Sequence, residues 1–264
     1  MIIASFNVNS VRQRIEHLTR WLQSRAPDIV CLQELKCQDE AFPRAEIEAL
    51  GYNVATHGQK TFNGVAILSK YPIEVEHRGL PGFEDEQARY IEAVASVPGD
   101  GDRPGEALRI CGVYFPNGNP APGPKYDYKM AFMAALTRHA ENLLKLEEKL
   151  VIAGDYNIIP EARDVKFPES WAADALFLPE SRAAYRRLLH LGFTDAVRAT
   201  SDAAGLYTFW DYQAGAWQRN NGIRIDHLLL SPRAADGLIE TGIDKDLRAE
   251  EKPSDHVPVW CRLR

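Results

Sequence analysis

Four consecutive apolar residues at 150–153 are followed by a glycine, a carboxylate and, two positions later, a carboxamide. An uninterrupted apolar run of this length is typical of a buried strand. Asp155 and Asn157 stand two positions apart, so their side chains point to the same side of an extended chain. Gly154 allows the backbone to turn there or to approach a ligand. The segment therefore predicts a buried strand that delivers two polar groups to the edge of a sheet.

Two other segments repeat this arrangement. Residues 224–230 carry Asp226 before a run of leucines, and residues 253–260 carry Asp255 and His256 before another apolar run. A lone acid at a strand end is usually a solvated surface group, so no single one of these residues identifies a site. Three acid-bearing strand ends together predict one shared polar site.

The distribution of apolar residues predicts more strands than helices. Helical periodicity is present at 10–24, with Ser10 as the expected N-cap, at 125–148, where Leu146 is expected to be buried, and at 180–191. Few connections resemble short crossover helices, which favours mixed or antiparallel sheets covered by helices over a doubly wound parallel sheet. The expected strands are 2–6, 28–33, 64–69, 90–97, 108–115, 150–154, 224–230 and 256–263. A chain of 264 residues fits one domain that spans 1–264.

Composition excludes several classes of protein. No apolar run approaches the roughly 20 residues that span a membrane, and the first residues lack the basic region of a signal peptide, so we expect a cytoplasmic enzyme without a membrane partner. The four cysteines have no paired spacing, so neither a disulfide nor a zinc finger is expected. The net charge of −6 argues against indiscriminate coating of nucleic acid. A carboxylate site that holds a divalent cation still presents positive charge locally.

Polar residues recur at or just beyond the ends of the expected strands. They are four carboxylates, two carboxamides, one phenol and one imidazole, namely Asn7, Glu34, Tyr114, Asp155, Asn157, Asp226, Asp255 and His256. Hard oxygen ligands suit Mg²⁺, or Mn²⁺ in its place, whereas one histidine without paired thiols fits zinc poorly. The set predicts a divalent-metal site.

The chain resembles the exonuclease III family of DNA-repair nucleases, within the endonuclease/exonuclease/phosphatase superfamily. The matching segments span nearly the whole chain and stand in the family's order. They are SFNVNS at 5–10, LQELK at 32–36, NGVAILS at 63–69, YFPNG at 114–118, GDYNI at 154–158, RID at 224–226 and SDH at 254–256. The resemblance implies an α/β fold, a four-layer sandwich in which two mixed β-sheets pack face to face with helices outside, and a site at one end of the sheets.

The resemblance also implies a role for each polar residue. Glu34, helped by Asn7 and Asp255, would hold Mg²⁺ against the scissile phosphate. His256, oriented by Asp226, would stabilise the charge that builds in the transition state. Three further residues are catalytic candidates. Asp155 would position or deprotonate the attacking water, and Asn157 would orient the phosphate or that water. Tyr114 would support the phosphate or the leaving oxygen. His227 would point away from Asp226 and have a structural role.

The long aromatic loop at 202–222 bears on the substrate. In relatives the matching loop lines a small apolar pocket for a base-free sugar, and Phe209 and Trp210 would form its wall here; the alternative is that both are plain core. Further candidate DNA contacts lie on loops and helix starts that the family places toward the duplex. They are Arg12, Lys60, Asn117, Lys125, Tyr126, Lys129, Arg219 and Asn221.

The resemblance implies a monomeric, Mg²⁺-dependent enzyme that acts on double-stranded DNA with abasic or 3′-blocked lesions. It would cleave the phosphodiester 5′ to abasic sites, with 3′→5′ exonuclease and 3′-phosphatase or 3′-phosphodiesterase activity at the same centre. One alternative is a paralogue that trims 3′ ends and has weak AP endonuclease activity. Another is a catalytically silent relative that only binds nucleic acid, although such a protein would have no reason to keep the polar set intact.

Overall fold

The first of two six-stranded sheets has the strand order β11-β12-β1-β2-β4-β3 in the computed structural model, which describes residues 1–99 and 104–264. Only β1 and β2 run parallel, while the other neighbours pair antiparallel, so the sheet is mixed. Its strands are β1 (Ile2–Asn7), β2 (Ile29–Gln33), β3 (Asn53–His57), β4 (Val65–Ser69), β11 (Leu238–Ile243) and β12 (Val259–Leu263).

The second sheet has the order β5-β6-β7-β8-β10-β9 and is also mixed, because β7 and β8 run parallel. Its strands are β5 (Ile73–Arg78), β6 (Tyr90–Val97), β7 (Glu106–Tyr114), β8 (Lys149–Asp155), β9 (Thr194–Asp195) and β10 (Asp226–Leu230). The inner faces of the two sheets pack on each other through one apolar core, to which Ile3 and Ile29 contribute from one side and Ile110, Val151 and Leu228 from the other. Burial of these β-branched and leucine side chains is the main stabilisation of the sandwich.

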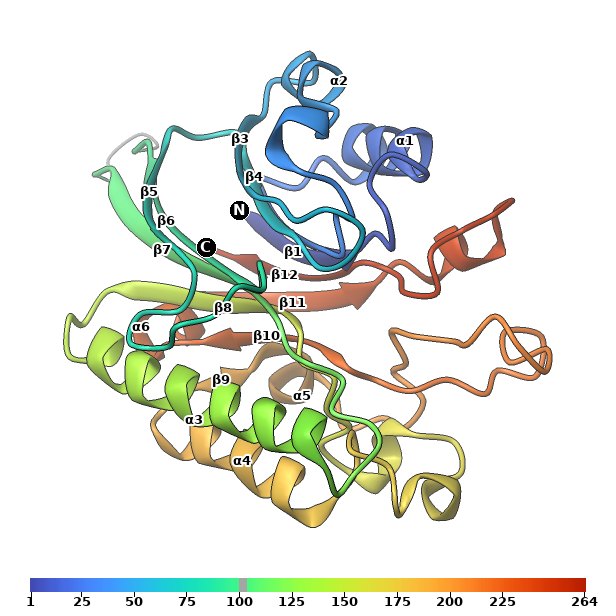
Figure 1. Ribbon diagram of the computed structural model, residues 1–264. Helices are drawn as coiled ribbons and strands as arrows, with labels where there is room; N and C mark the ends of the chain where they lie inside the picture. The colour runs from blue at the N-terminus through green and yellow to red at the C-terminus, as the bar shows by residue number, and fades with distance from the viewer. Residues whose placement is uncertain (100–103) are drawn as a thin grey trace.

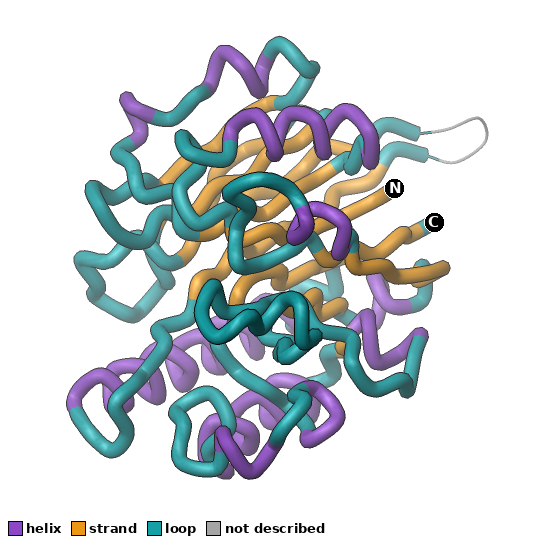
Figure 2. The backbone as a smooth tube through the Cα atoms, turned by 90° about the vertical axis from the view of Figure 1, so that its right-hand side faces the viewer, coloured by secondary structure: helices purple, strands orange, loops and turns teal. Residues whose placement is uncertain are grey.

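Helices cover both outer faces and complete four layers (Figures 1 and 2). Leu18 and Leu22 of α1 pack on the outside of the first sheet, and Phe132 and Leu136 of α3 pack on the outside of the second. The helices are α1 (Ile15–Arg25), α2 (Arg44–Glu48), α3 (Pro124–Leu144), α4 (Pro179–His190), α5 (Ala196–Thr200) and α6 (Pro232–Ala235). The expected four-layer sandwich is confirmed. No helix in the described ranges is long and apolar enough to cross a membrane.

Two details of the predicted helices were wrong. Helix α1 begins at Ile15, because Ser10 has a φ of +85° and lies in a turn that precedes the helix; Arg14 occupies the N-cap position. Helix α3 ends at Leu144, and Leu146 lies beyond it with 52% of its surface exposed. In both cases an apolar residue at helical spacing, Val11 before α1 and Leu146 after α3, lies outside the helix in an adjoining turn.

Four strands were missed, and they are the four edge strands β3, β5, β9 and β11. Strand β5 is largely exposed and β11 has no fully buried residue, so neither carries the apolar run that marks a central strand. Strand β9 has only two residues. Edge strands bury little surface and therefore leave a weak signal in the sequence.

Candidate active site

Three polar residues stand in a row across the second sheet. The register pairs Tyr114 of β7 with Asp155 of β8, and Asp155 with Asp226 of β10. Directly paired residues project from the same face of a sheet, about 5 Å apart. The row lies where β7 and β8 end and where the antiparallel β10 begins.

The first sheet and its flanking segments supply the other side of the site. Asn7 is the last residue of β1, and Glu34 directly follows β2. His256 lies just before β12 and forms an isolated bridge with Phe209. The site therefore lies at one end of the seam between the two sheets.

Asn7 links the carboxylates of the two sheets. Its Nδ2 donates to Glu34 Oε1 at 2.9 Å and to Asp155 Oδ2 at 3.0 Å, and the Tyr114 hydroxyl donates to the same Glu34 oxygen at 3.0 Å. Lys36 forms an ion pair with Glu34 Oε2 at 2.9 Å. Burial alone would raise the pKa of Glu34, but the field of Lys36 and the hydrogen bond from Asn7 outweigh burial and lower it. Glu34 is therefore ionised at neutral pH.

His256 lies between two buried carboxylates. Its Nδ1 lies 2.8 Å from Asp226 Oδ2, and its Nε2 lies 3.7 Å from Asp155 Oδ2. Burial would lower the pKa of His256, but Asp226 and Asp155 raise it to about 10, so the ring carries a positive charge. Burial raises the pKa of Asp155 to about 7 against the opposing field of His256. The site thus holds a fixed cation beside a carboxyl group that can exchange a proton near neutral pH.

Glu34, Asp155 and His256 each present a possible ligand atom, and these atoms lie within 4.8 Å of one another. Two carboxylates at this separation fit a hard divalent cation, whereas the protonated imidazole offers no lone pair. Asp255 is not one of these three residues, and its Oδ1 accepts from Asn9 Nδ2 at 3.0 Å. Asn7 presents its amide nitrogen to the carboxylates while its Oδ1 accepts the Asn9 backbone N–H at 3.0 Å. The role of Asn7 and Asp255 as helpers of Glu34 in metal binding stays a prediction.

Asn157 lies at the bottom of the site in a left-handed turn with a φ of +48°. Its backbone N–H donates to Asp155 Oδ1 at 2.9 Å, and its Nδ2 donates to the carbonyl of Phe115 at 3.0 Å. The Oδ1 atom is left with a single long contact of 3.4 Å to Asn117 Nδ2. A turn tied in this way holds a carboxamide oxygen and a carboxylate in a fixed relation.

The two aromatic residues of the long loop have different surroundings. The Phe209 ring is half-buried and lies 4.9 Å from the His256 ring, where it borders an apolar cluster that includes Leu176 and Ile223. Trp210 is fully buried, packs on Trp217 at 5.0 Å and donates from Nε1 to Asn220. Successive residues of an extended segment point to opposite sides, so only Phe209 reaches the site. The prediction that Trp210 lines a pocket was wrong.

One of the expected DNA contacts was also wrong. Lys129 is fully buried, and its ammonium donates to backbone carbonyls instead of facing solvent. Tyr126 is half-buried, and its hydroxyl pairs with Ser181 Oγ at 2.9 Å. The other candidates are exposed and available to a ligand: Arg12, Lys60, Asn117, Lys125, Arg219 and Asn221.

Sequence reasoning missed a polar groove that begins at Glu34 and Tyr114. Arg89 lies over the Tyr114 ring at 4.7 Å, and Phe62 is 67% exposed at the rim of the groove. Its remaining lining residues are Lys36, Gln59, Asn63 and Gln87. Lys36 and Asn63 belong to matched sequence segments, which was the signal available. Nothing in the sequence pattern marked Gln87 or Arg89.

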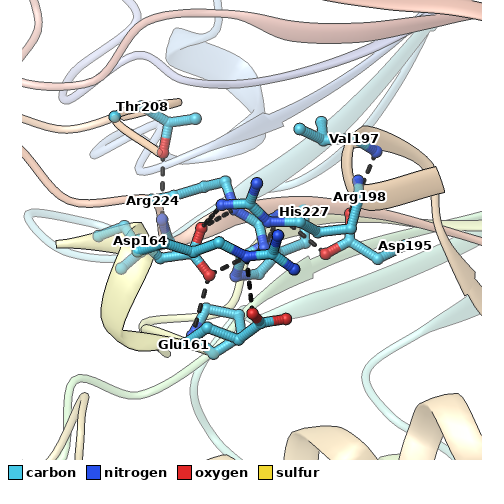
Figure 3. A network of polar contacts seen from close by, with 12 residues as sticks. Glu161, Asp164, Asp195, Val197, Arg198, Thr208, Arg224 and His227 are labelled. Atoms are coloured by element: carbon cyan, nitrogen blue, oxygen red, sulfur yellow. Dashed lines mark hydrogen bonds and ion pairs between the residues drawn. The ribbon is translucent and has the colours of Figure 1, made fainter. Parts of the chain in front are cut away.

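A buried ionic network stands behind β10, as Figure 3 shows. The Arg224 guanidinium forms two hydrogen bonds to Asp164, at 2.6 and 3.1 Å, and one to Asp195 at 2.8 Å. Arg198 also pairs with Asp164, so two cations face two carboxylates. Burial and Arg224 lower the pKa of His227 to about 4, so this ring is neutral. Its Nδ1 faces Arg224, and its Nε2 donates to the carbonyl of Ile158. The network holds the chain at Arg224, two residues before Asp226, where β10 begins.

Comparison with known proteins gives consistent matches over the whole chain. Residues 4–256 match the model of the Endonuclease/Exonuclease/phosphatase family. Exodeoxyribonuclease III of Haemophilus influenzae is 37% identical over 273 residues, with 100% of both chains covered. Among solved structures, the 3′ phosphatase NExo from Neisseria, bound to a product DNA hairpin, has a TM-score of 0.93 at 37% identity. An AP endonuclease from Archaeoglobus fulgidus has a TM-score of 0.92 at 34% identity, and each alignment covers 100% of this chain and 99% of the other.

Proposed function

The chain belongs to the endonuclease/exonuclease/phosphatase family, and we propose that it is a DNA-repair nuclease that cleaves the phosphodiester 5′ to abasic sites in duplex DNA. The same centre would act as a 3′→5′ exonuclease and 3′-phosphatase. The observation that carries the proposal is the junction of Glu34, Asp155 and protonated His256 beside the half-buried Phe209 ring. This arrangement supports a centre in which metal-binding, proton-transferring and charge-stabilising groups act next to an apolar wall of the kind that suits a sugar without its base.

Each side chain has a distinct role in the proposed reaction. Asp155, with its raised pKa, accepts a proton from the attacking water. His256 donates a hydrogen bond from Nε2 to a phosphate oxygen as negative charge builds there, and Asp226 holds its Nδ1. Asn157 orients the attacking water, whose O–H donates to the carboxamide Oδ1, and the Tyr114 hydroxyl supports the leaving oxygen.

Glu34, helped by Asn7 and Asp255, would hold the cation, for which we propose Mg²⁺ with Mn²⁺ as a substitute. When bound, the metal supplies Lewis-acid stabilisation of the phosphate. The proposal also includes a monomer that acts in the cytoplasm, in keeping with four buried cysteines that are all free. Its substrates are duplexes with abasic sites or blocked 3′ ends.

Removal of metal tests the proposal as a whole. The enzyme should lose incision of a tetrahydrofuran-containing duplex in EDTA and recover it with Mg²⁺ or Mn²⁺. Glu34→Gln should raise the Mg²⁺ concentration for half-maximal activity by at least about tenfold, because it removes a charged oxygen ligand. Duplex binding in EDTA, measured by fluorescence anisotropy, should change little.

The control for this experiment is Glu40→Gln, which alters an exposed carboxylate outside the site. It should leave the metal titration unchanged. Full incision by the wild-type protein in excess EDTA would refute a metal-dependent nuclease.

The choice between an AP endonuclease and a 3′-trimming paralogue rests on Phe209. The similarity to the Neisseria 3′ phosphatase supports the alternative of a 3′-trimming paralogue. Phe209→Ala should lower kcat/KM for abasic-site incision by at least about tenfold, because it removes apolar contact with the sugar, while 3′-phosphate hydrolysis should fall much less. Both rates are measured on the same duplex scaffold.

Trp210→Ala provides the comparison for a core residue. It should cost about 3–5 kcal/mol of stability, and both activities should fall together with the folded fraction. If Phe209→Ala melts normally and impairs the two reactions equally, the sugar pocket is elsewhere and the trimming paralogue is favoured.

A further inference from the structure

Lys129 is a fully buried lysine beside the site. It lies in the second turn of α3, and its Nζ donates to the carbonyls of Asn117 at 3.0 Å, Asn157 at 2.5 Å and Ala175 at 3.4 Å. An ammonium group has three N–H donors, so all three find acceptors in the protein. None is left for solvent or for a DNA phosphate.

The three carbonyls come from three separate segments that meet at the site. Asn117 lies in the connection from β7 to α3, Asn157 forms the left-handed turn after β8, and Ala175 lies between a 3₁₀ helix (Pro168–Trp171) and α4. The segments also touch directly: Asn157 Nδ2 donates to the Phe115 carbonyl at 3.0 Å, the Ala175 N–H donates to Asn119 Oδ1 at 3.0 Å, and the Ile159 N–H donates to the Leu176 carbonyl at 2.9 Å. Those bonds join the segments two at a time, whereas Lys129 Nζ reaches all three from one point.

The backbone is built closely around this side chain. Gly118 has a φ of +91°, and a Cβ placed on it would lie 2.7 Å from Lys129 Cδ. The loop after β7 can follow its path only because a glycine passes over the lysine stem.

The buried charge is costly and has no direct counter-charge. Within the described ranges Lys129 forms no ion pair with a carboxylate, and burial lowers its pKa to about 7 despite the opposing fields of Asp155 and Asp174. Burial of an ammonium without a paired carboxylate disfavours the folded state unless all of its donors are satisfied. An ammonium group whose three N–H donors all bind carbonyls of separate segments can hold those segments together, and we call this arrangement a clamp.

We propose that Lys129 is a positioning residue that fixes the Asn117, Asn157 and Ala175 segments relative to one another, and so holds Asn157 and Asp155 in register with the scissile phosphate. The inference rests on the proposed nuclease function and extends it to a residue that does not touch DNA. A phosphate contact would act on binding, whereas a positioning residue acts on turnover.

Lys129→Met and Lys125→Met separate these two roles on one helix. Lys129→Met should lower kcat on the abasic duplex by about 10- to 100-fold, because small displacements of catalytic groups are amplified in the rate. KM and the salt dependence of duplex binding should stay unchanged. Lys125 is exposed one turn earlier, so Lys125→Met should raise KM and reduce the slope of log K against log salt by about 1.

Lys129→Arg and one spectroscopic measurement keep the test decisive if the Met variant does not fold. The Arg variant keeps the charge but cannot place three donors at one point, so kcat should fall at an unchanged salt slope. The wild-type Lys129 ¹⁵Nζ resonance should show slow hydrogen exchange, as expected of a buried, fully bonded ammonium. Lys145→Met, at the exposed far end of α3, should match the wild type.

The outcomes also distinguish this inference from the function on which it rests. A folded Lys129→Arg with wild-type kcat, a loss confined to KM and the salt slope, or a rapidly exchanging Nζ would each overturn the positioning role. Absence of metal-dependent cleavage in both the wild type and Lys145→Met would instead overturn the nuclease proposal, while the exchange measurement would still test the clamp.

Discussion

Asp155→Asn and His256→Ala should each lower kcat on an abasic duplex by about 10²-fold or more, the range for positioned acid-base and electrostatic groups. Asn cannot accept the proton that Asp155 is placed to take. Removing the imidazolium leaves Asp226 and Asp155 facing each other without the cation that separates them. Single-turnover rates at saturating enzyme measure the effect on chemistry, and anisotropy at the same salt concentration should show nearly unchanged duplex affinity.

The control is Asp236→Asn, which changes an exposed aspartate at the end of α6. It should retain wild-type rates. A fall of Asp155→Asn turnover by less than about threefold would remove Asp155 from the chemistry, since a positioned general base contributes far more than this.

Arg224→Met should lower the free energy of unfolding by about 3–5 kcal/mol, the cost of leaving a buried carboxylate without its partner. Arg224 is completely buried and is the main partner of Asp195, while Asp164 would keep Arg198. Urea unfolding monitored by circular dichroism measures the loss. Arg262→Met is the matched control, because its ion pair with Glu240 at 2.9 Å is about half exposed and should contribute less than about 1 kcal/mol.

The same network predicts a specific loss of stability in acid. Burial opposes ionisation of Asp195, but Arg224 outweighs it and lowers the pKa to about 2, below the value of about 3.9 for an unfolded chain. A depressed carboxyl pKa contributes stability above the unfolded value, and this stability is lost as pH falls through the folded one. Wild-type stability should therefore decline between about pH 4 and pH 2, and Arg224→Met should show a shallower decline. Equal slopes would show that the guanidinium does not set the titration of Asp195.

The central strands and their terminal polar groups could be predicted from sequence because a buried strand requires an uninterrupted apolar run. Residues 150–153 and 228–230 provide such runs, and register then brings Asp155 opposite Asp226. Most residues of edge strand β5 are exposed and need not be apolar, so this strand carries no such run. The local sequence pattern therefore predicted the central strands of each sheet but not its edge strands.

Burial of individual polar and aromatic residues was harder to predict. Lys129 and Trp210 look like surface and pocket residues by type, yet each has its polar atoms satisfied inside the protein. That outcome depends on partners brought together by tertiary structure, such as the Asn157 carbonyl and the Asn220 side chain. Lys125, of the same type as Lys129 and on the same helix, is exposed. Residue type alone could not separate the two.

The position of the site on the seam between the sheets has a consequence for how activity appears during folding. Tyr114, Asp155 and Asp226 belong to one sheet, whereas Asn7 ends a strand of the other sheet and Glu34 directly follows one. These two parts of the site meet only when the inner faces of the sheets have docked. An intermediate with either sheet alone would contain fragments of the site that are too far apart to act. Catalysis should therefore return after secondary structure in a refolding time course, in step with exclusion of solvent from the intersheet core. The rate at which activity recovers would then report the rate of the final docking step.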